Sequence, residues 1–81
     1  MLYTFPRYPL IAVDPEVCTG KPHIVGTRIT VSAILAHLAG GMSVETMMAE
    51  FPRLTKDGIF QALAFASNQL QDQYFPIESA A

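Results

Sequence analysis

Residues 31–70 decide the fold of this chain and read VSAILAHLAGGMSVETMMAEFPRLTKDGIFQALAFASNQL. Apolar residues recur in this stretch in three successive sets, each with the i, i+3, i+4, i+7 spacing of an amphipathic helix. The sets are Val31, Ile34, Leu35 and Leu38; Val44, Met47, Met48 and Phe51; and Ile59, Ala62, Leu63 and Ala66 with Leu70 one turn on. The spacing predicts helices over residues 31–39, 43–51 and 55–71.

The residues between these sets are suited to end one helix and begin the next. Gly40 and Gly41 separate the first two, and glycine readily adopts the left-handed conformation that ends many helices. Ser43 and Thr55 can N-cap the second and third helices. Pro52 ends the second, because the residue before a proline is disfavoured in the α region. Three short helices with tight turns can bury their apolar faces only against one another, which predicts a trihelical helix-turn-helix core.

Two apolar β-type runs precede the helices. Residues 10–13 (LIAV) end at Asp14-Pro15, a turn opener, and residues 23–30 (HIVGTRIT) place Gly26-Thr27 between β-branched runs. A Gly-X pair in this setting is typical of a two-residue type II′ β-hairpin. A lone hairpin is marginal in water, so it needs residues 10–13 as a third strand, a second subunit, or the helices beneath it. The expected fold class is mainly α, with a short β-hairpin or strand region before the trihelical core, over residues 10–70.

Composition limits the possible functions. Hydrophobic residues make up 51% of the chain and charged residues 15%, against roughly 25% charged in ordinary soluble domains. A domain of 81 residues cannot hide that much apolar surface, so we expect a homodimer. The net charge of −2 is unfavourable for a nucleic-acid binder acting alone. The single cysteine, with neither a signal peptide nor a membrane span in the sequence, predicts a cytoplasmic protein without contact to a membrane.

The two ends of the chain are aromatic. Residues 1–9 hold three aromatic side chains interrupted by two prolines, which predicts an extended arm that packs either on its own core or on a partner. Residues 71–81 form the expected extended tail, in which Tyr74, Phe75 and Ile77 are candidates for holding a protein partner. The alternative for the tail is a frayed or self-docked end.

The run from Ile11 to Ile29 (IAVDPEVCTGKPHIVGTRI), with the turn at residues 41–43 and the motif at residues 51–55 (FPRLT), resembles domain-of-unknown-function family 433. The resemblance covers about residues 10–68. It implies a homeodomain-like trihelical fold and a VapB-like antitoxin, encoded beside a PIN-like ribonuclease toxin. The chain departs from the family pattern at His23, at Gly58, and in a third helix that is nearly uncharged beyond its first turn.

No catalytic or metal site is expected. Cys18, His23 and His37 are three potential metal ligands without a fourth and without the usual paired spacing. Cys18 has no evident base to activate it as a nucleophile. We therefore predict no enzyme and no cofactor.

Arg28 is the only charged residue in an apolar, β-branched neighbourhood. One interpretation is an ion pair, with Asp14 the nearest plausible carboxylate, or a clamp on a backbone carbonyl. The other is a contact with a phosphate or a protein partner. A guanidinium group suits either role.

The third predicted helix carries the candidate DNA-binding residues. With Ile59, Leu63, Ala66 and Leu70 facing inward, the opposite face holds Asp57, Gln61, Ala64, Asn68 and Gln71. Gln61 and Asn68 could read adenine in the major groove, while Arg53 and Lys56 could hold flanking phosphates. The alternative is an ordinary solvated helix face.

Two functions remain open at this point. The first is an antitoxin of a type II toxin-antitoxin system, which neutralises a PIN-like ribonuclease and binds its own operator DNA through the helix-turn-helix. The second is a protein-interaction or dimerisation module that uses a helix-turn-helix shell without binding DNA. The charge balance favours the second, and the family resemblance favours the first.

Overall fold

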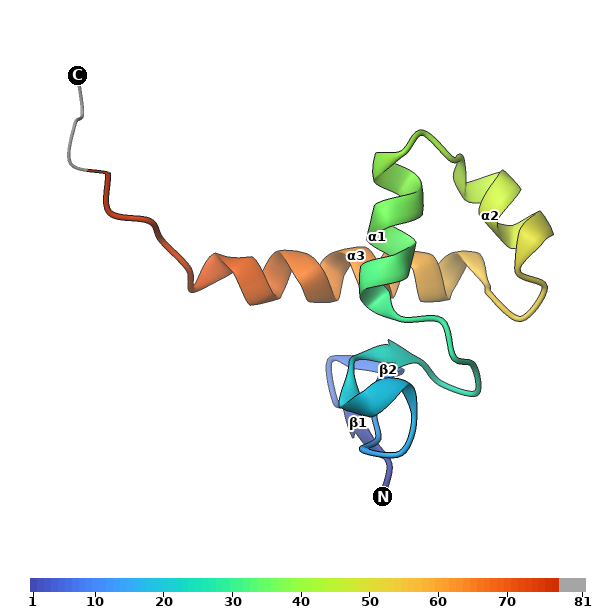
Figure 1. The fold of residues 1–81 in the computed structure, drawn as a ribbon, viewed down its shortest axis with the longest axis horizontal. Coiled ribbons are helices and arrows are strands. Elements are labelled where there is room, and N and C mark those ends of the chain that lie inside the picture. The colour runs from blue at the N-terminus through green and yellow to red at the C-terminus, as the bar shows by residue number, and fades with distance from the viewer. Residues whose placement is uncertain (78–81) are drawn as a thin grey trace.

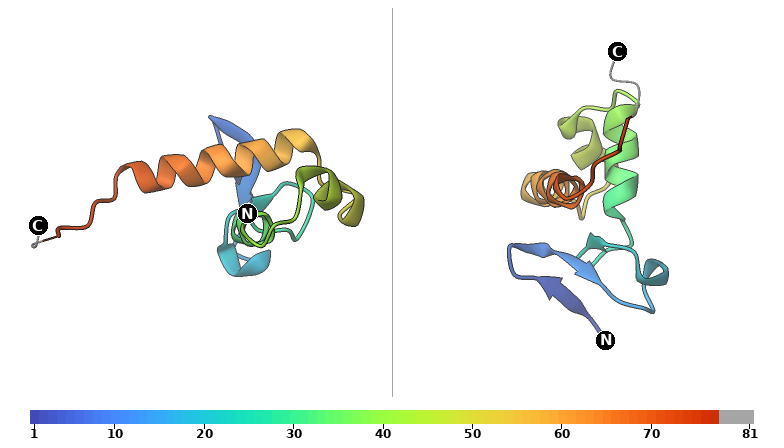
Figure 2. Two further views of the ribbon diagram at one scale, coloured as in Figure 1. Left: turned by 90° about the horizontal axis from the view of Figure 1, so that it is seen from above. Right: turned by 90° about the vertical axis from the view of Figure 1, so that its left-hand side faces the viewer.

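Residues 1–77, which the computed structural model describes, form a three-stranded antiparallel sheet followed by three α-helices (Figure 1). The strands are β1 (Tyr3–Phe5), β2 (Tyr8–Val13) and β3 (His23–Ile24), and they lie side by side in chain order. A single 3-10 turn, η1 (Cys18–Gly20), precedes β3, and the helices are α1 (Val31–Ala39), α2 (Val44–Glu50) and α3 (Lys56–Gln71). The sheet lies on one side of the helices in Figure 1 and in the right-hand view of Figure 2.

The three helices confirm the prediction from apolar spacing, with bounds that differ by at most one residue. Each helix is N-capped by a hydroxyl side chain. Thr30, Ser43 and Thr55 accept hydrogen bonds from the backbone N–H three residues on, each at 3.0 Å. These caps satisfy donors that the first helical turn cannot pair internally. In residues 1–77 no helix combines the length and apolarity that crossing a bilayer requires.

The expectation of a mainly α fold with a trihelical core is wrong, because the sheet forms part of the same core. Ile11 of β2 and Ile24 of β3 are buried together with Ile34 of α1, Met47 of α2 and Ile59 of α3. α3 packs against both α1 and β2. The apolar faces of the helices are therefore buried partly against strands, and the domain is one of mixed α and β structure.

The predicted hairpin over residues 23–30 is also mostly wrong. β3 ends at Ile24 and pairs with β2, in the register Ile11↔Ile24. The following residues form a loop closed by a hydrogen bond from the Ile24 N–H to the Ile29 carbonyl, 2.9 Å long. Only a single antiparallel β-bridge, between His23 and Thr30, pairs the residues before this loop with those after it. Because Thr30 already caps α1, no second strand can extend there. Of the three supports considered for this region, the segment at residues 10–13 is the one that pairs with it.

The aromatic arm folds back on its own core. β1 pairs with β2 in an antiparallel hairpin, with a register shift between Thr4 and Phe5. The rings of Phe5 and Tyr8 lie against Phe65 of α3, with centroids 4.8 and 5.7 Å away. These contacts attach the hairpin to the helices.

The predicted inward face of α3 needs correction. Ile59 is buried as expected and Ala66 half-buried, whereas Leu63 and Leu70 are 36% and 65% exposed. Phe65, which the prediction left out, is only 6% exposed. The buried face is rotated because α3 must also cover the β1–β2 hairpin, and Phe65 is the side chain that reaches it.

We expect Phe65→Ala to lower the free energy of unfolding by about 3–5 kcal/mol, because it removes a buried aromatic ring and leaves a cavity. The matched control is Leu70→Ala on the same helix, where the side chain is 65% exposed, and its loss should stay near 1 kcal/mol or below. Urea denaturation followed by circular dichroism measures both. Equal losses in the two variants would contradict this assignment of the buried face.

Candidate functional site

The outward face of α3, where a helix-turn-helix protein would meet DNA, is mainly apolar. Phe60 is 50% exposed and Leu63 36% exposed, and Ala64 and Ser67 beside them are also exposed. These four positions follow the i, i+3, i+4, i+7 spacing and so form one stripe. We call this stripe the α3 outer face. Exposed polar side chains, Asp57 and Gln71, lie at the two ends of this stripe.

Gln61, a candidate base reader, points toward the sheet. Its side-chain oxygen Oε1 accepts a hydrogen bond from the Leu10 N–H of β2, at 2.9 Å. The Leu10 carbonyl accepts a hydrogen bond from the Val25 N–H at 2.9 Å. Because β3 ends at Ile24, no carbonyl of that strand accepts the Leu10 N–H. Gln61 supplies that partner, so its role in the structure is to join α3 to β2.

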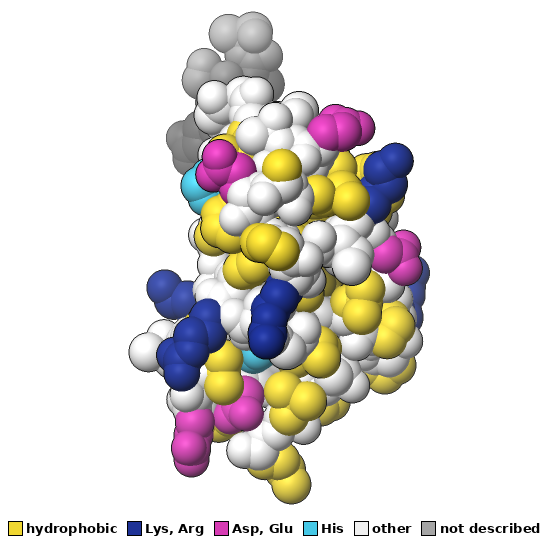
Figure 3. Space-filling view, turned by 90° about the vertical axis from the view of Figure 1, so that its right-hand side faces the viewer, with side chains coloured by type: hydrophobic (Ala, Val, Ile, Leu, Met, Phe, Trp, Pro, Cys, Tyr) yellow, Lys and Arg dark blue, Asp and Glu magenta, His cyan; other side chains and the backbone are white. Residues whose placement is uncertain are grey.

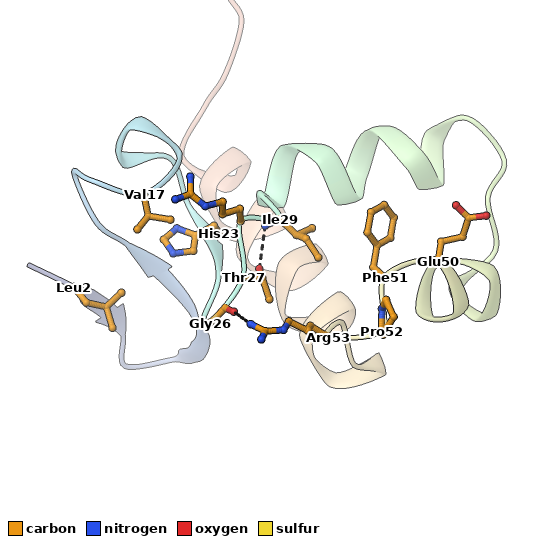
Figure 4. Close-up of a pocket in the computed structure, with 11 residues that line it drawn as sticks. Leu2, Val17, His23, Gly26, Thr27, Ile29, Glu50, Phe51, Pro52 and Arg53 are labelled. Carbon is orange, nitrogen blue, oxygen red and sulfur yellow. Dashed lines mark hydrogen bonds between the residues drawn. The ribbon is translucent and has the colours of Figure 1, made fainter.

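Arg53, a candidate phosphate contact, is exposed but is also tied to the chain. Its Nη1 donates to the Gly26 carbonyl at 2.9 Å (Figure 4). This bond links the turn between α2 and α3 to the loop after β3. The turn itself is closed by a bond from Leu54 N–H to the Phe51 carbonyl, at 2.8 Å.

The four candidate DNA-binding residues do not form one surface. Lys56 is exposed at the start of α3, and Asn68 is half-buried near its end. Twelve residues of helix separate them, which is roughly 18 Å along the axis. Gln61 and Arg53 are directed toward β2 and toward the loop after β3, respectively.

The ion pair considered for Arg28 does not form in residues 1–77. Asp14 instead accepts the Glu16 N–H at 2.9 Å and lies 3.7 Å from the N-terminal ammonium. The Arg28 side chain is exposed. Its carbonyl accepts a hydrogen bond from Cys18 Sγ at 3.3 Å, so the backbone of Arg28 is held while its guanidinium group stays accessible.

The three side chains considered as metal ligands each have a separate local role. Cys18 bonds to the Arg28 carbonyl, and Nδ1 of His23 lies 3.1 Å from the Lys21 carbonyl oxygen. His37 packs against Phe51, with ring centroids 5.5 Å apart. Within the described part of the chain, no three His, Cys, Asp or Glu side chains cluster as a metal site would require.

The candidate partner-binding residues of the tail are accessible. Tyr74, Phe75 and Ile77 are 83%, 74% and 77% exposed, and Figure 1 shows this segment leading away from the helices. Gln71 is still helical, and residues 78–81 of the predicted tail lie outside the described residues.

Sequence reasoning missed a cleft of about 610 Å³ between the loop after β3 and the turn before α3. It is lined by Leu2, Val17, His23, Gly26, Thr27, Arg28, Ile29, Glu50, Phe51, Pro52 and Arg53. The motifs GTRI and FPRL supply seven of these residues, Gly26–Ile29 and Phe51–Arg53. Two such motifs, set apart in the sequence, could have suggested a shared site. Only the fold shows that they meet.

Comparison with known proteins identifies the family. A family model described as "Protein of unknown function (DUF433)" matches residues 11–66, from β2 to α3. A DUF433 member protein from Anabaena variabilis ATCC 29413, known from a 2.00 Å crystal structure, is 29% identical, with a TM-score of 0.70. That match covers 73% of this chain and 58% of the other. No curated protein matches the chain. Since the family model spans well over half of its length, this chain belongs to the DUF433 family of proteins of unknown function.

Proposed function

We propose that this protein is a protein-interaction module that forms a homodimer through the α3 outer face. The observation that carries the proposal is the exposed apolar stripe at Phe60, Leu63 and Ala64. Exposed apolar surface of this kind marks interaction sites, and aromatic side chains dominate the energy of such interfaces. A two-fold axis across α3 would pair the stripe with itself, as homodimer interfaces do.

The partner proposed for the dimer is a PIN-like ribonuclease, held by the tail residues Tyr74, Phe75 and Ile77. These side chains are exposed and lie outside the region matched by the family model. An extended segment with aromatic anchors can fold onto a partner surface when it binds. This proposal keeps the antitoxin role that the resemblance to family 433 implies. It assigns that role to protein contacts.

DNA binding by the protein alone has less support. Gln61 and Arg53 make hydrogen bonds within the chain, and the net charge is −2. The α3 outer face offers apolar side chains where base edges require donors and acceptors.

We expect the purified protein to be a dimer at micromolar concentration and Phe60→Glu to be a folded monomer. A buried pair of glutamates across the two-fold axis would repel and lack partners. Ala49→Glu, at an exposed position of α2, adds the same charge elsewhere and should leave the dimer intact. Sedimentation velocity measures the association state, and circular dichroism checks the fold. A monomeric wild-type protein, or a dimeric Phe60→Glu variant, would show that the α3 outer face is not the interface.

The proposed role of the tail in holding a ribonuclease can be tested by measuring inhibition of that enzyme. We expect the wild-type protein to inhibit a PIN-like ribonuclease encoded by the adjacent gene, in a fluorogenic RNA assay. Phe75→Ser should raise the inhibition constant about tenfold or more, as expected for loss of an aromatic anchor. Gln73→Ser, an exposed polar neighbour, should change it little. The absence of such a gene, or equal inhibition by both variants, would refute the ribonuclease partner.

The salt dependence of DNA affinity tests the remaining candidate function. Lys56 and the free N–H groups of Arg53 give a dimer about four possible phosphate contacts, so log K should fall with log salt by a slope no steeper than about −4. Gln61→Ala should lower the free energy of unfolding by about 1–2 kcal/mol, because Leu10 loses its partner, and should leave sequence preference unchanged. Fluorescence anisotropy on the upstream promoter duplex and a scrambled duplex measures both quantities. A slope clearly steeper than −4, or a preference for the promoter that Gln61→Ala abolishes, would restore the base-reading interpretation.

A further inference from the structure

We propose that the cleft between the loop after β3 and the turn before α3 binds an anionic group carried on an apolar body. The carboxylate or phosphate of the ligand would lie against the guanidinium groups of Arg28 and Arg53. A hydroxyl or N–H of the ligand would donate to His23. The cleft contains no residue of α3, so the site does not depend on the dimer proposed above.

The size and lining of the cleft suit a small ligand. Its volume of about 610 Å³ lies within the roughly 300–1,000 Å³ of typical ligand sites. Leu2, Val17, Ile29, Phe51 and Pro52 supply apolar walls. Apolar walls with a few polar groups are the usual composition of a ligand pocket.

The two arginines supply positive charge that the described chain does not neutralise. In residues 1–77 the one ion pair within 4.0 Å joins the N-terminal ammonium to Asp14, so no carboxylate there pairs with either guanidinium. Glu50 also lines the cleft, but Figure 4 shows its carboxylate at the far end, pointing away from Arg53. Arg53 uses one N–H on Gly26, and a guanidinium group has five. Both arginines therefore keep donors for an oxyanion.

His23 supplies an acceptor at the base of the cleft. The side chain is 2% exposed, and its Nδ1 must donate to the Lys21 carbonyl oxygen, 3.1 Å away, because a carbonyl can only accept. In the neutral ring this leaves a lone pair on Nε2. Within the described residues no fully buried side-chain nitrogen or oxygen lacks a hydrogen-bond partner. Since Nε2 has no protein partner there, this atom is not fully buried, and His23 is one of the residues that line the cleft.

The backbone around the cleft is held in place before any ligand binds. Thr27 Oγ1 donates to the Ile24 carbonyl at 2.8 Å and accepts from the Ile29 N–H at 3.0 Å. Cys18, which bonds to the Arg28 carbonyl, has a positive φ of 52°. Such a conformation is costly outside glycine and is typical of sites where position matters. A preformed site loses less entropy on binding.

The same face of the molecule shows where the charge gathers. In Figure 3 Lys and Arg side chains lie to the left of and above a small patch of histidine surface, with apolar side chains beside it and acidic ones directly below. An anion approaching this face would meet positive charge next to the apolar surface.

The test is a titration with small probes, followed by ¹H–¹⁵N correlation spectra. The probes are 4-hydroxyphenylacetate, phenylacetate without the donor, 4-methylphenol without the anion, and phenyl phosphate. We expect 4-hydroxyphenylacetate to bind saturably and to shift the amides of residues 23–29 and 50–53. It should bind several-fold more tightly than phenylacetate, and 4-methylphenol should bind weakest. Comparison of phenyl phosphate with phenylacetate decides between a phosphate and a carboxylate ligand.

Two variants test whether the positive charge of Arg28 contributes to ligand binding. Arg28→Gln removes an exposed guanidinium group whose side chain makes no hydrogen bond in the described residues, and it should weaken binding about tenfold or more. Arg7→Gln removes an exposed arginine outside the cleft and should leave affinity unchanged. Equal affinity in the two variants, equal binding of 4-methylphenol, or the absence of saturable shifts at these amides would each overturn the proposal.

Discussion

The fold depends on α3 packing against two neighbours at once, the other two helices and the β1–β2 hairpin. Ile59 and Ala62 join the core shared with α1 and α2, while Phe65 turns to the β1–β2 hairpin. Gln61 adds a directed bond to the same hairpin, at Leu10. Without these contacts the apolar side of the sheet, at Ile11 and Ile24, would lose the cover that the helix gives it. The helix therefore holds the sheet in place, and the sheet in turn decides which face of the helix is buried.

This double role explains which parts of the fold the sequence could predict. The helices follow from local information, namely apolar spacing and the hydroxyl caps at Ser43 and Thr55, and the structure places all three helices as expected. The hairpin at residues 23–30 was wrong because strand pairing is settled by distant residues. The Gly26 turn is real, with φ of +78°, but no strand follows it for β3 to pair with, because Thr30 already caps α1.

The candidate site was harder to predict for the same reason. The apolar residues of α3 are numerous enough to define more than one stripe, and periodicity alone could not show that Phe65 would be buried and Leu70 exposed. Gln61 on an amphipathic helix is usually a solvent-facing residue, and nothing local shows that Leu10 needs an acceptor. The motif residues Arg28 and Arg53 were recognisable as unusual. Their meeting in one cleft follows from the Arg53–Gly26 bond, which joins positions 27 residues apart.

The same interactions determine what it would cost Gln61 to act as a base reader. For Gln61 to bind adenine, it would have to release the Leu10 N–H, and this partly buried donor left without a partner costs about 1–2 kcal/mol. A good bidentate base contact contributes about the same amount of discrimination, so the exchange yields little. Turning α3 to present other residues would expose Phe65 and detach the hairpin. The packing of the sheet on α3 thus commits the outward face to Phe60, Leu63 and Ala64, and that face is chemically suited to another apolar surface.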